Sequence, residues 1–233
     1  MTEQQLSSGF PVYVAGNTDS RRAVIVIQEA FGVNDHIRSV ADRFADAGYF
    51  VVAPHLFHRD GSPVIAYDDF PSAMKVMGNL NKEGLTNDLK ATTDFLTTVG
   101  YSAPNIGIVG YCMGGTVTFC AATTGTVGAA ASFYGGGVET GRFGLAPLVE
   151  LAPSLACPWL GLYGDLDSGI PVEQVEHLRD AAATSSQLTE IVRYADGDHG
   201  FHCDARPQVY NPIAAADAHQ RTIDFFAAQL TDK

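Results

Sequence analysis

The sequence predicts the α/β class, with a mostly parallel central sheet covered by helices on both faces. Apolar runs rich in β-branched residues, typical of strands buried on both faces, alternate along the chain with runs of helical spacing. The 233 residues are 46% hydrophobic and 17% charged, enough for one sizeable core, and we find no internal repeat or low-complexity linker. We therefore expect a single domain over residues 1–233.

The first elements follow in order from the amino terminus. FPVYVA and RRAVIVI are separated by GNTDS, which favours an antiparallel hairpin. AVIVIQ at 23–28 is a short continuous apolar strand. The next segment begins with the capping pair Asn34-Asp35, places apolar residues at helical spacing and stops at Gly48. YFVVAP at 49–54 is the following strand, closed by its proline.

The same reasoning gives the remaining elements. Residues 72–99 are predicted to be mostly helical, with interruptions around Gly78 and Gly84. The later elements are strands at 105–111, 128–135, 158–164 and 188–194, helices at 113–122 and 172–183, and a closing helix with Ile223, Phe226 and Leu230 on one side.

Composition excludes several classes of protein. The formal net charge is −12 and no basic run occurs, which argues against nucleic acid or an anionic membrane as partner. The amino terminus lacks the pattern of a signal peptide, and no apolar stretch approaches the roughly 20 residues that span a bilayer. Four cysteines without C-x-x-C spacing indicate reduced thiols. We expect a cytoplasmic monomer or small homo-oligomer that acts on a small molecule.

One glycine-rich turn indicates chemistry. Gly110-Tyr111-Cys112-Met113-Gly114 follows a predicted strand and opens a predicted helix. A nucleophile on such a bend stands clear of the sheet, and glycines two residues to either side let the backbone pass closely. The helix amino terminus favours thiolate over thiol at Cys112. A buried structural cysteine needs none of these features.

Ligands bind beyond the carboxyl ends of parallel strands, and further polar residues follow the predicted strands there. Asp167 and His199 come after Cys112 in the order nucleophile, acid, histidine that enzymes with this elbow use. Asp165 competes with Asp167 as the acid, and the residues alone leave both open. His202, Cys203 and Asp204 suggest a metal cluster at first glance, but no metal-ligand spacing is met elsewhere, so we expect none.

These pieces together resemble the dienelactone hydrolase (carboxymethylenebutenolidase-like) family. The matching segments are QEAFGVN (28–34), GYCMGG (110–115), FYGGG (133–137), YGDLDSGIP (163–171) and GDHGF (197–201). The resemblance covers most of the chain and implies the α/β-hydrolase fold. It also implies a Cys-His-Asp triad that opens lactones and related esters without a metal or organic cofactor: Cys112 as nucleophile, His199 as base and Asp167 as its orienter.

The resemblance gives roles to further residues. Glu29 would contact the resting thiol and help to ionise it; the alternative is a carboxylate that reaches solvent at the sheet rim. The backbone N–H groups of Ala30 and Met113 would form the oxyanion hole. Arg206 would hold a substrate carboxylate or simply lie at the surface, and Tyr134 would line the pocket or pack. Other members use another arginine from the loop before the middle helices, whereas this chain has no Lys or Arg between Arg59 and Lys75.

The predicted reaction is hydrolysis of a lactone or small ester through a thioester on Cys112. One alternative is an acyltransferase or thioesterase of the same fold. Another is a non-catalytic protein that binds a ligand or senses oxidation through the same cysteine.

Overall fold

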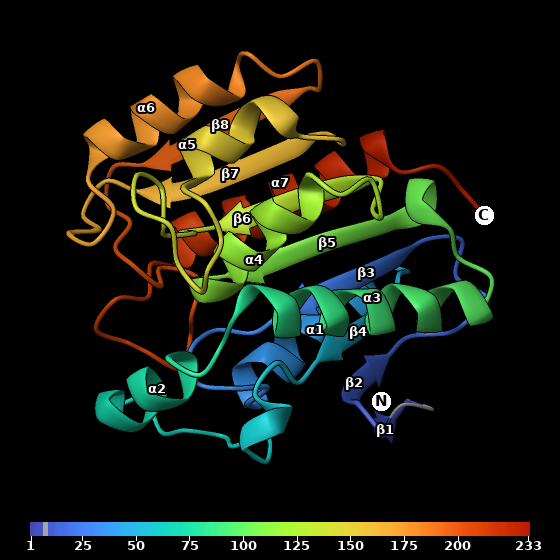
Figure 1. The fold of residues 1–233 in the computed structure, drawn as a ribbon. Helices are drawn as coiled ribbons and strands as arrows, with labels where there is room; N and C mark the ends of the chain where they lie inside the picture. The colour runs from blue at the N-terminus through green and yellow to red at the C-terminus, as the bar shows by residue number, and fades with distance from the viewer. Residues whose placement is uncertain (7–8) are drawn as a thin grey trace.

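The computed structural model describes residues 1–6 and 9–233 and contains an eight-stranded sheet (Figure 1). The strands are β1 (Thr2–Gln5), β2 (Pro11–Ala15), β3 (Ala23–Ile27), β4 (Phe50–Pro54), β5 (Ile106–Tyr111), β6 (Ala129–Phe133), β7 (Trp159–Gly164) and β8 (Thr189–Tyr194). The α-helices are α1 (Asp35–Asp46), α2 (Phe70–Met77), α3 (Lys82–Thr98), α4 (Met113–Ala122), α5 (Leu148–Leu151), α6 (Val172–Ala182) and α7 (Pro212–Gln229). Short 3-10 turns lie at His58–Asp60, Ala103–Asn105 and Ala152–Ser154.

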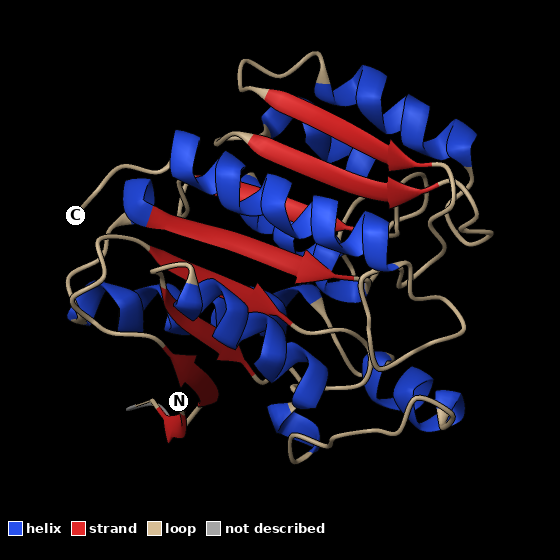
Figure 2. Cartoon of the chain, turned by 180° about the vertical axis from the view of Figure 1, so that it is seen from behind, coloured by secondary structure: helices blue, strands red, loops and turns tan. Residues whose placement is uncertain are grey.

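The strand order is β1-β2-β4-β3-β5-β6-β7-β8, and every pair from β4 to β8 is parallel. Helices α3, α4 and α6 lie in front of the sheet in Figure 1, whereas α7 lies behind it. Figure 2 shows that rear face from the other side. There Phe44 of α1 packs on Phe226 of α7, with ring centroids 6.2 Å apart. The predicted mostly parallel sheet with helices on both faces is confirmed.

The predicted hairpin near the amino terminus is wrong. β2 pairs antiparallel with β4, which lies between β2 and β3. The link from residue 16 to residue 22 is longer than a tight hairpin turn, so it can cross the roughly 10 Å of two strand spacings. Gly16, at a φ of +80°, lies against the Tyr49 backbone at the start of β4. A side chain there would collide with that backbone.

Capping side chains open four of the described helices, α1, α2, α3 and α7. Asn34 caps α1 by accepting a hydrogen bond from the Ile37 N–H at 3.1 Å. The predicted break near Gly78 is present between α2 and α3, but the break at Gly84 is absent. Gly84 lies in the first turn of α3 and donates its N–H to the Asn81 side chain at 2.9 Å. Glycine costs little there, because the cap supplies the acceptor.

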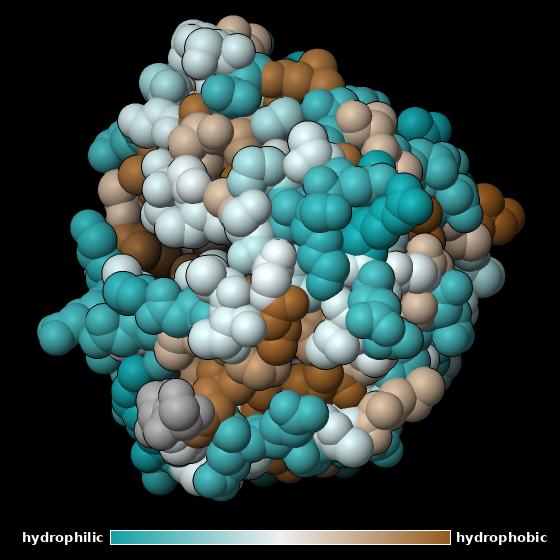
Figure 3. Space-filling view, turned by 90° about the vertical axis from the view of Figure 1, so that its right-hand side faces the viewer, coloured by the Kyte–Doolittle hydropathy of each residue, from teal (hydrophilic) through white to brown (hydrophobic). Residues whose placement is uncertain are grey.

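The sheet topology fixes where a ligand can bind. β3 has β4 on one side and β5 on the other, so the chain changes direction across the sheet at this point. The carboxyl ends of β3 and β5 to β8 lie at one edge, on the left in Figure 1. The opposite end, shown in Figure 3, carries a mixture of hydrophilic and hydrophobic side chains. Among the described residues, no helix is long and apolar enough to span a membrane.

We expect Gly110→Ala to destabilise the fold by about 3 kcal/mol, the upper end of typical overpacking costs. A Cβ at this position would overlap the Gly114 carbonyl and lie 2.5 Å from Thr118 Oγ1, where β5 and α4 pack closely. Chemical denaturation of the two proteins measures the loss. Gly84→Ala is the matched control, because its Cβ would meet only side-chain atoms at 3.3–3.4 Å. A Gly110→Ala protein as stable as this control would contradict the close packing.

Candidate active site

Cys112 occupies the bend between β5 and α4. Its φ of 56° and ψ of −119° lie where few residues other than glycine are found. The bend is held by the Cys112 N–H, which donates to the Phe133 carbonyl at 3.1 Å, and by Gly115, which donates to the Cys112 carbonyl at 2.9 Å. Gly114 is needed because a Cβ would lie 2.5 Å from the Gln28 carbonyl oxygen. The structure thus has the strand-turn-helix context that the glycine pattern predicts.

Asp167, and not Asp165, contacts His199. Asp167 Oδ2 lies 2.6 Å from His199 Nδ1, while Oδ1 accepts the N–H groups of Gly169 at 2.8 Å and Ile170 at 3.1 Å. The carboxylate is 3% exposed and is therefore held rigidly. Asp165 instead forms a two-bond ion pair with Arg193, at 2.8 and 2.9 Å. The sequence leaves both aspartates open as the acid, and their different partners in the structure distinguish them.

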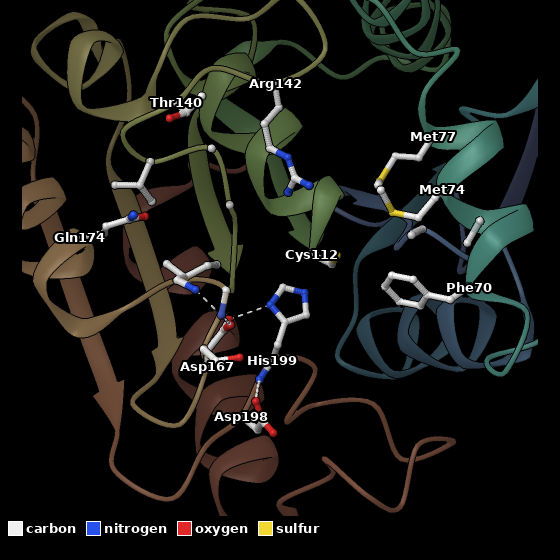
Figure 4. A pocket seen from close by; sticks show the side chains of 18 of the residues that line it. Phe70, Met74, Met77, Cys112, Thr140, Arg142, Asp167, Gln174, Asp198 and His199 are labelled. Carbon is white, nitrogen blue, oxygen red and sulfur yellow. Dashed lines mark hydrogen bonds and ion pairs between the residues drawn. The ribbon is translucent and has the colours of Figure 1, made fainter.

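The His199 ring lies between Asp167 and Cys112 (Figure 4). Since Nδ1 faces the carboxylate, Nε2 is the ring nitrogen left for the sulfur. Burial alone would lower the pKa of His199. The negative charges of the Cys112 thiolate and Asp167, together with hydrogen bonds to both, outweigh burial and hold this pKa well above 6.5. The three groups therefore form one electrostatic unit.

The backbone N–H groups of Met113 and Ala30, the two expected oxyanion donors, have no backbone acceptor among the contacts of the described residues. Met113 is the first residue of α4, so its N–H has no acceptor within the helix. Ala30 follows β3 and lines the same pocket as Cys112. Among the described residues, neither N–H donates to a backbone carbonyl in a turn, loop or helix cap.

Glu29 is a buried carboxylate that follows β3, the neighbour of β5. Ile27, the last residue of β3, pairs with Gly110 of β5, so Glu29 follows β3 at the same edge of the sheet as Cys112. Tyr134 donates its hydroxyl to Glu29 Oε1 at 3.2 Å, and Oε2 has no hydrogen-bond partner among the residues described. Tyr134 itself is 0% exposed and packs on the His199 ring, with centroids 5.2 Å apart. This burial favours the packing alternative for Tyr134 over a direct substrate contact.

A cavity of about 870 Å³ joins Cys112, Asp167 and His199. Arg206 also lines it, and its guanidinium lies over the rings of Phe31 and Tyr67, at 5.8 and 5.9 Å. Sequence reasoning missed other lining residues, namely Arg142 on the loop after β6 and Phe70, Met74 and Met77 of α2. The i, i+4, i+7 spacing of the last three was a usable signal, because it puts them on one helix face.

Within the described ranges, one group of side chains has the donors of a metal site: Glu29, His36 and Cys203, whose ligand atoms lie within 4.8 Å of one another. Cys203 donates its thiol to the Tyr67 hydroxyl at 3.2 Å, and burial raises the pKa of Cys203 to about 12. A metal would need the thiolate. The protonated Cys203 thiol therefore argues against a metal in this group, while Glu29 Oε2 and His36 Nε2 have no hydrogen-bond partner among the described residues.

Comparison with known proteins decides the family. The model of the Dienelactone hydrolase family matches residues 10–230. The chain belongs to the dienelactone hydrolase family. Membership places it among hydrolases of lactones and esters and confirms the family that the motifs indicate.

Relatives of this dienelactone hydrolase family member extend over most of the chain. A Synechocystis protein named "Putative carboxymethylenebutenolidase" is 34% identical over 212 residues, which cover 89% of this chain and 86% of that protein. The carboxymethylenebutenolidase of Pseudomonas putida is 29% identical over 215 residues, covering 90% and 87%. A solved structure from Klebsiella pneumoniae, named "Putative Dienelactone Hydrolase", has a TM-score of 0.86 at 34% identity and covers 97% of each chain. The α/β-hydrolase fold is confirmed.

Proposed function

We propose that this protein hydrolyses a lactone or small carboxylic ester through a thioester on Cys112, with His199 as proton carrier and Asp167 as the residue that orients it. The observation that carries the proposal is the 2.6 Å contact between Asp167 and His199 in the cavity that Cys112 also lines. We also infer that residues 1–233 form one domain, because one sheet runs from β1 to β8.

In the first step, the Cys112 thiolate attacks the carbonyl carbon and a C–S bond forms. The N–H groups of Ala30 and Met113 donate to the resulting oxyanion. As the C–O bond breaks, the leaving alkoxide takes a proton from His199 Nε2, and a thioester remains. In a lactone the new hydroxyl stays attached to the acyl chain.

The electrostatics of His199 suit it to both steps. The thiolate is one of the groups that raise its pKa, so the ring carries a proton while the sulfur is charged. Thioester formation removes that charge, and burial then pulls the pKa of His199 down. The ring can now accept a proton from water as the water attacks the thioester. The C–S bond breaks, the carboxylic acid leaves, and the ion pair forms again.

Trapping the intermediate tests this proposal. Acid quenching of the enzyme during turnover of p-nitrophenyl hexanoate should leave one hexanoyl group on the protein, seen by intact-mass spectrometry. Peptide mapping should place the group on Cys112, and neutral hydroxylamine should remove it, as expected of a thioester. An acyl group on any other residue would contradict the proposal. A competing alcohol added during turnover distinguishes the acyltransferase alternative, which would release the alcohol's ester instead of free hexanoate.

We further propose that Glu29 receives the proton of the resting Cys112 thiol when substrate binds and returns it to the sulfur after each turnover. Its unpartnered Oε2 supports this role, because a buried carboxylate oxygen without a donor is costly. Glu29→Gln should slow the p-nitrophenol burst of the first turnover by about 100-fold, the lower end of proton-transfer contributions. Deacylation should keep its rate, since Glu29 does not contact the attacking water in this mechanism. An unchanged burst would assign Glu29 a purely structural role.

A further inference from the structure

Tyr134 has a strained backbone beside the candidate active site. It directly follows β6, and its φ of 39° lies in the left-handed region, where a residue with a bulky side chain is rare. Its N–H donates to the Leu162 carbonyl of β7 at 2.8 Å, which holds the backbone in place. Cys112, at a φ of 56°, has the same feature. Such strain gathers at working sites, so the contacts of the Tyr134 side chain indicate its purpose.

The Tyr134 hydroxyl holds Glu29. It donates to Glu29 Oε1 at 3.2 Å, and across residues 1–6 and 9–233 no other donor lies within hydrogen-bond distance of this carboxylate. Tyr134 and Glu29 are both buried, and neither lines the cavity. Burial and the negative charge of Glu29 raise the pKa of Tyr134 well above its usual range, so the hydroxyl stays a donor. The orientation of Glu29 therefore depends on this one hydrogen bond.

The Tyr134 ring packs against the candidate base. Its centroid lies 5.2 Å from that of His199 and 5.4 Å from that of Phe201. One residue thus joins Glu29, which follows β3, to the loop after β8 that carries His199. The contacts with the loop come from the ring, whereas the contact with Glu29 comes from the hydroxyl. Removing the oxygen alone therefore separates the two.

We propose that Tyr134 is a positioning residue for acylation: its hydroxyl holds Glu29 Oε1 so that Oε2 can take the Cys112 proton. This inference rests on the proposed function and on the role of Glu29 within it. The S–H bond breaks, an O–H bond forms at Oε2, and the electron pair stays on sulfur. Tyr134 keeps its own proton throughout and donates to Oε1 whether or not Oε2 is protonated.

Two physical effects make this hydrogen bond matter. The last torsion of a glutamate side chain is broad, so without a donor on Oε1 the direction of Oε2 is poorly fixed. A donor also favours the charged form of a buried carboxylate, and only the charged form of Glu29 can accept a proton. Loss of the hydroxyl should therefore slow proton transfer from the thiol while leaving the nucleophile, the oxyanion donors and the His199 contact in place.

Tyr134→Phe tests the proposal with p-nitrophenyl hexanoate. The p-nitrophenol burst of the first turnover should slow by about 10-fold, the lower end of the worth of a hydrogen bond to a charged group. Deacylation should keep its rate. The pH at half-maximal burst rate should also rise, since a buried carboxylate that loses its donor needs a higher pH to ionise. Adding Tyr134→Phe to Glu29→Gln should slow the burst no further, because Tyr134 acts only through Glu29.

Tyr163→Phe is the matched control. Tyr163 is also buried, and its hydroxyl donates to the Gly135 carbonyl at 3.3 Å, next to Tyr134 but without contact to Glu29. This variant should keep the burst rate and its pH dependence. An equal slowing in Tyr163→Phe would overturn the proposal, as would an unchanged burst in Tyr134→Phe or a further, independent loss in the double variant.

The double variant keeps the proposal testable even if Tyr134→Phe lowers the stability of the fold, because a purely structural loss would add to that of Glu29→Gln. Circular dichroism measures the folded fraction of each protein. Failure of the proposed function would appear differently, as turnover of the ester by Cys112→Ala.

Discussion

Cys112→Ala is expected to lower kcat for p-nitrophenyl hexanoate by about 10⁴-fold or more, as loss of the nucleophile does in enzymes with a comparable triad. Without sulfur at the bend, no thioester can form, and His199 and Asp167 have no reaction to assist. The oxyanion donors and the cavity would remain, and they would support only a small residual rate. Steady-state kinetics measure the loss, and circular dichroism verifies the fold.

Cys120→Ala is the matched control for this prediction. Cys120 belongs to α4, the same helix that Cys112 precedes, but it does not line the cavity. Burial raises the pKa of its thiol to about 11, so it is a poor nucleophile at neutral pH. The control should keep full activity. If Cys112→Ala also turned over the ester at the wild-type rate, the sulfur would have no part in catalysis.

The elements that carry the site could be predicted because short-range patterns determine them. The glycine pattern around Cys112 is recognisable within five residues, and the structure explains it by the contacts of Gly110 with Gly114 and of Gly114 with Gln28. The buried parallel strands were equally predictable from their apolar runs. The order of polar residues at strand ends then placed Asp167 and His199 at one edge of the sheet.

The parts that failed depend on long-range pairing. The apolar residues of β2 fit equally well beside β3 or β4, and only the complete sheet distinguishes the two. β1 is a strand of four exposed polar residues at the sheet edge, so it has no hydrophobic pattern to detect. The residues alone left Asp165 and Asp167 open and the resemblance favoured Asp167, in agreement with its contact to His199; the Asp165 partner, Arg193, lies 28 residues away in the sequence.

Arg142 was missed for a related reason. No local pattern indicates where a long side chain on an irregular loop will point. Its direction follows from the space left by Gly136 and Gly137, and that space exists only once the loop has folded over the cavity.

Asp167→Asn is expected to lower kcat/KM by about 10³- to 10⁴-fold, as the corresponding change does in a serine-protease triad. The N–H groups of Gly169 and Ile170 both donate to Oδ1, so an asparagine would keep its oxygen there and turn its NH₂ toward His199 Nδ1. Nδ1 would then accept a hydrogen bond, and the proton of the neutral ring would move to Nε2. In that tautomer the ring cannot take a proton from water.

The substitution should also change the titration of His199. Asp167 raises the pKa of His199 by charge and by a hydrogen bond, whereas burial lowers it. Removing the carboxylate leaves burial less opposed, so the pKa must fall, and NMR titration of the labelled ring should show its midpoint at lower pH than in wild type. Asp165→Asn is the control, because Asp165 contacts Arg193 instead, and it should leave both the midpoint and the activity near wild type. Equal losses of activity in Asp167→Asn and Asp165→Asn would contradict a role for Asp167 in the triad. Only Asp167 contacts His199, so only its substitution should impair catalysis.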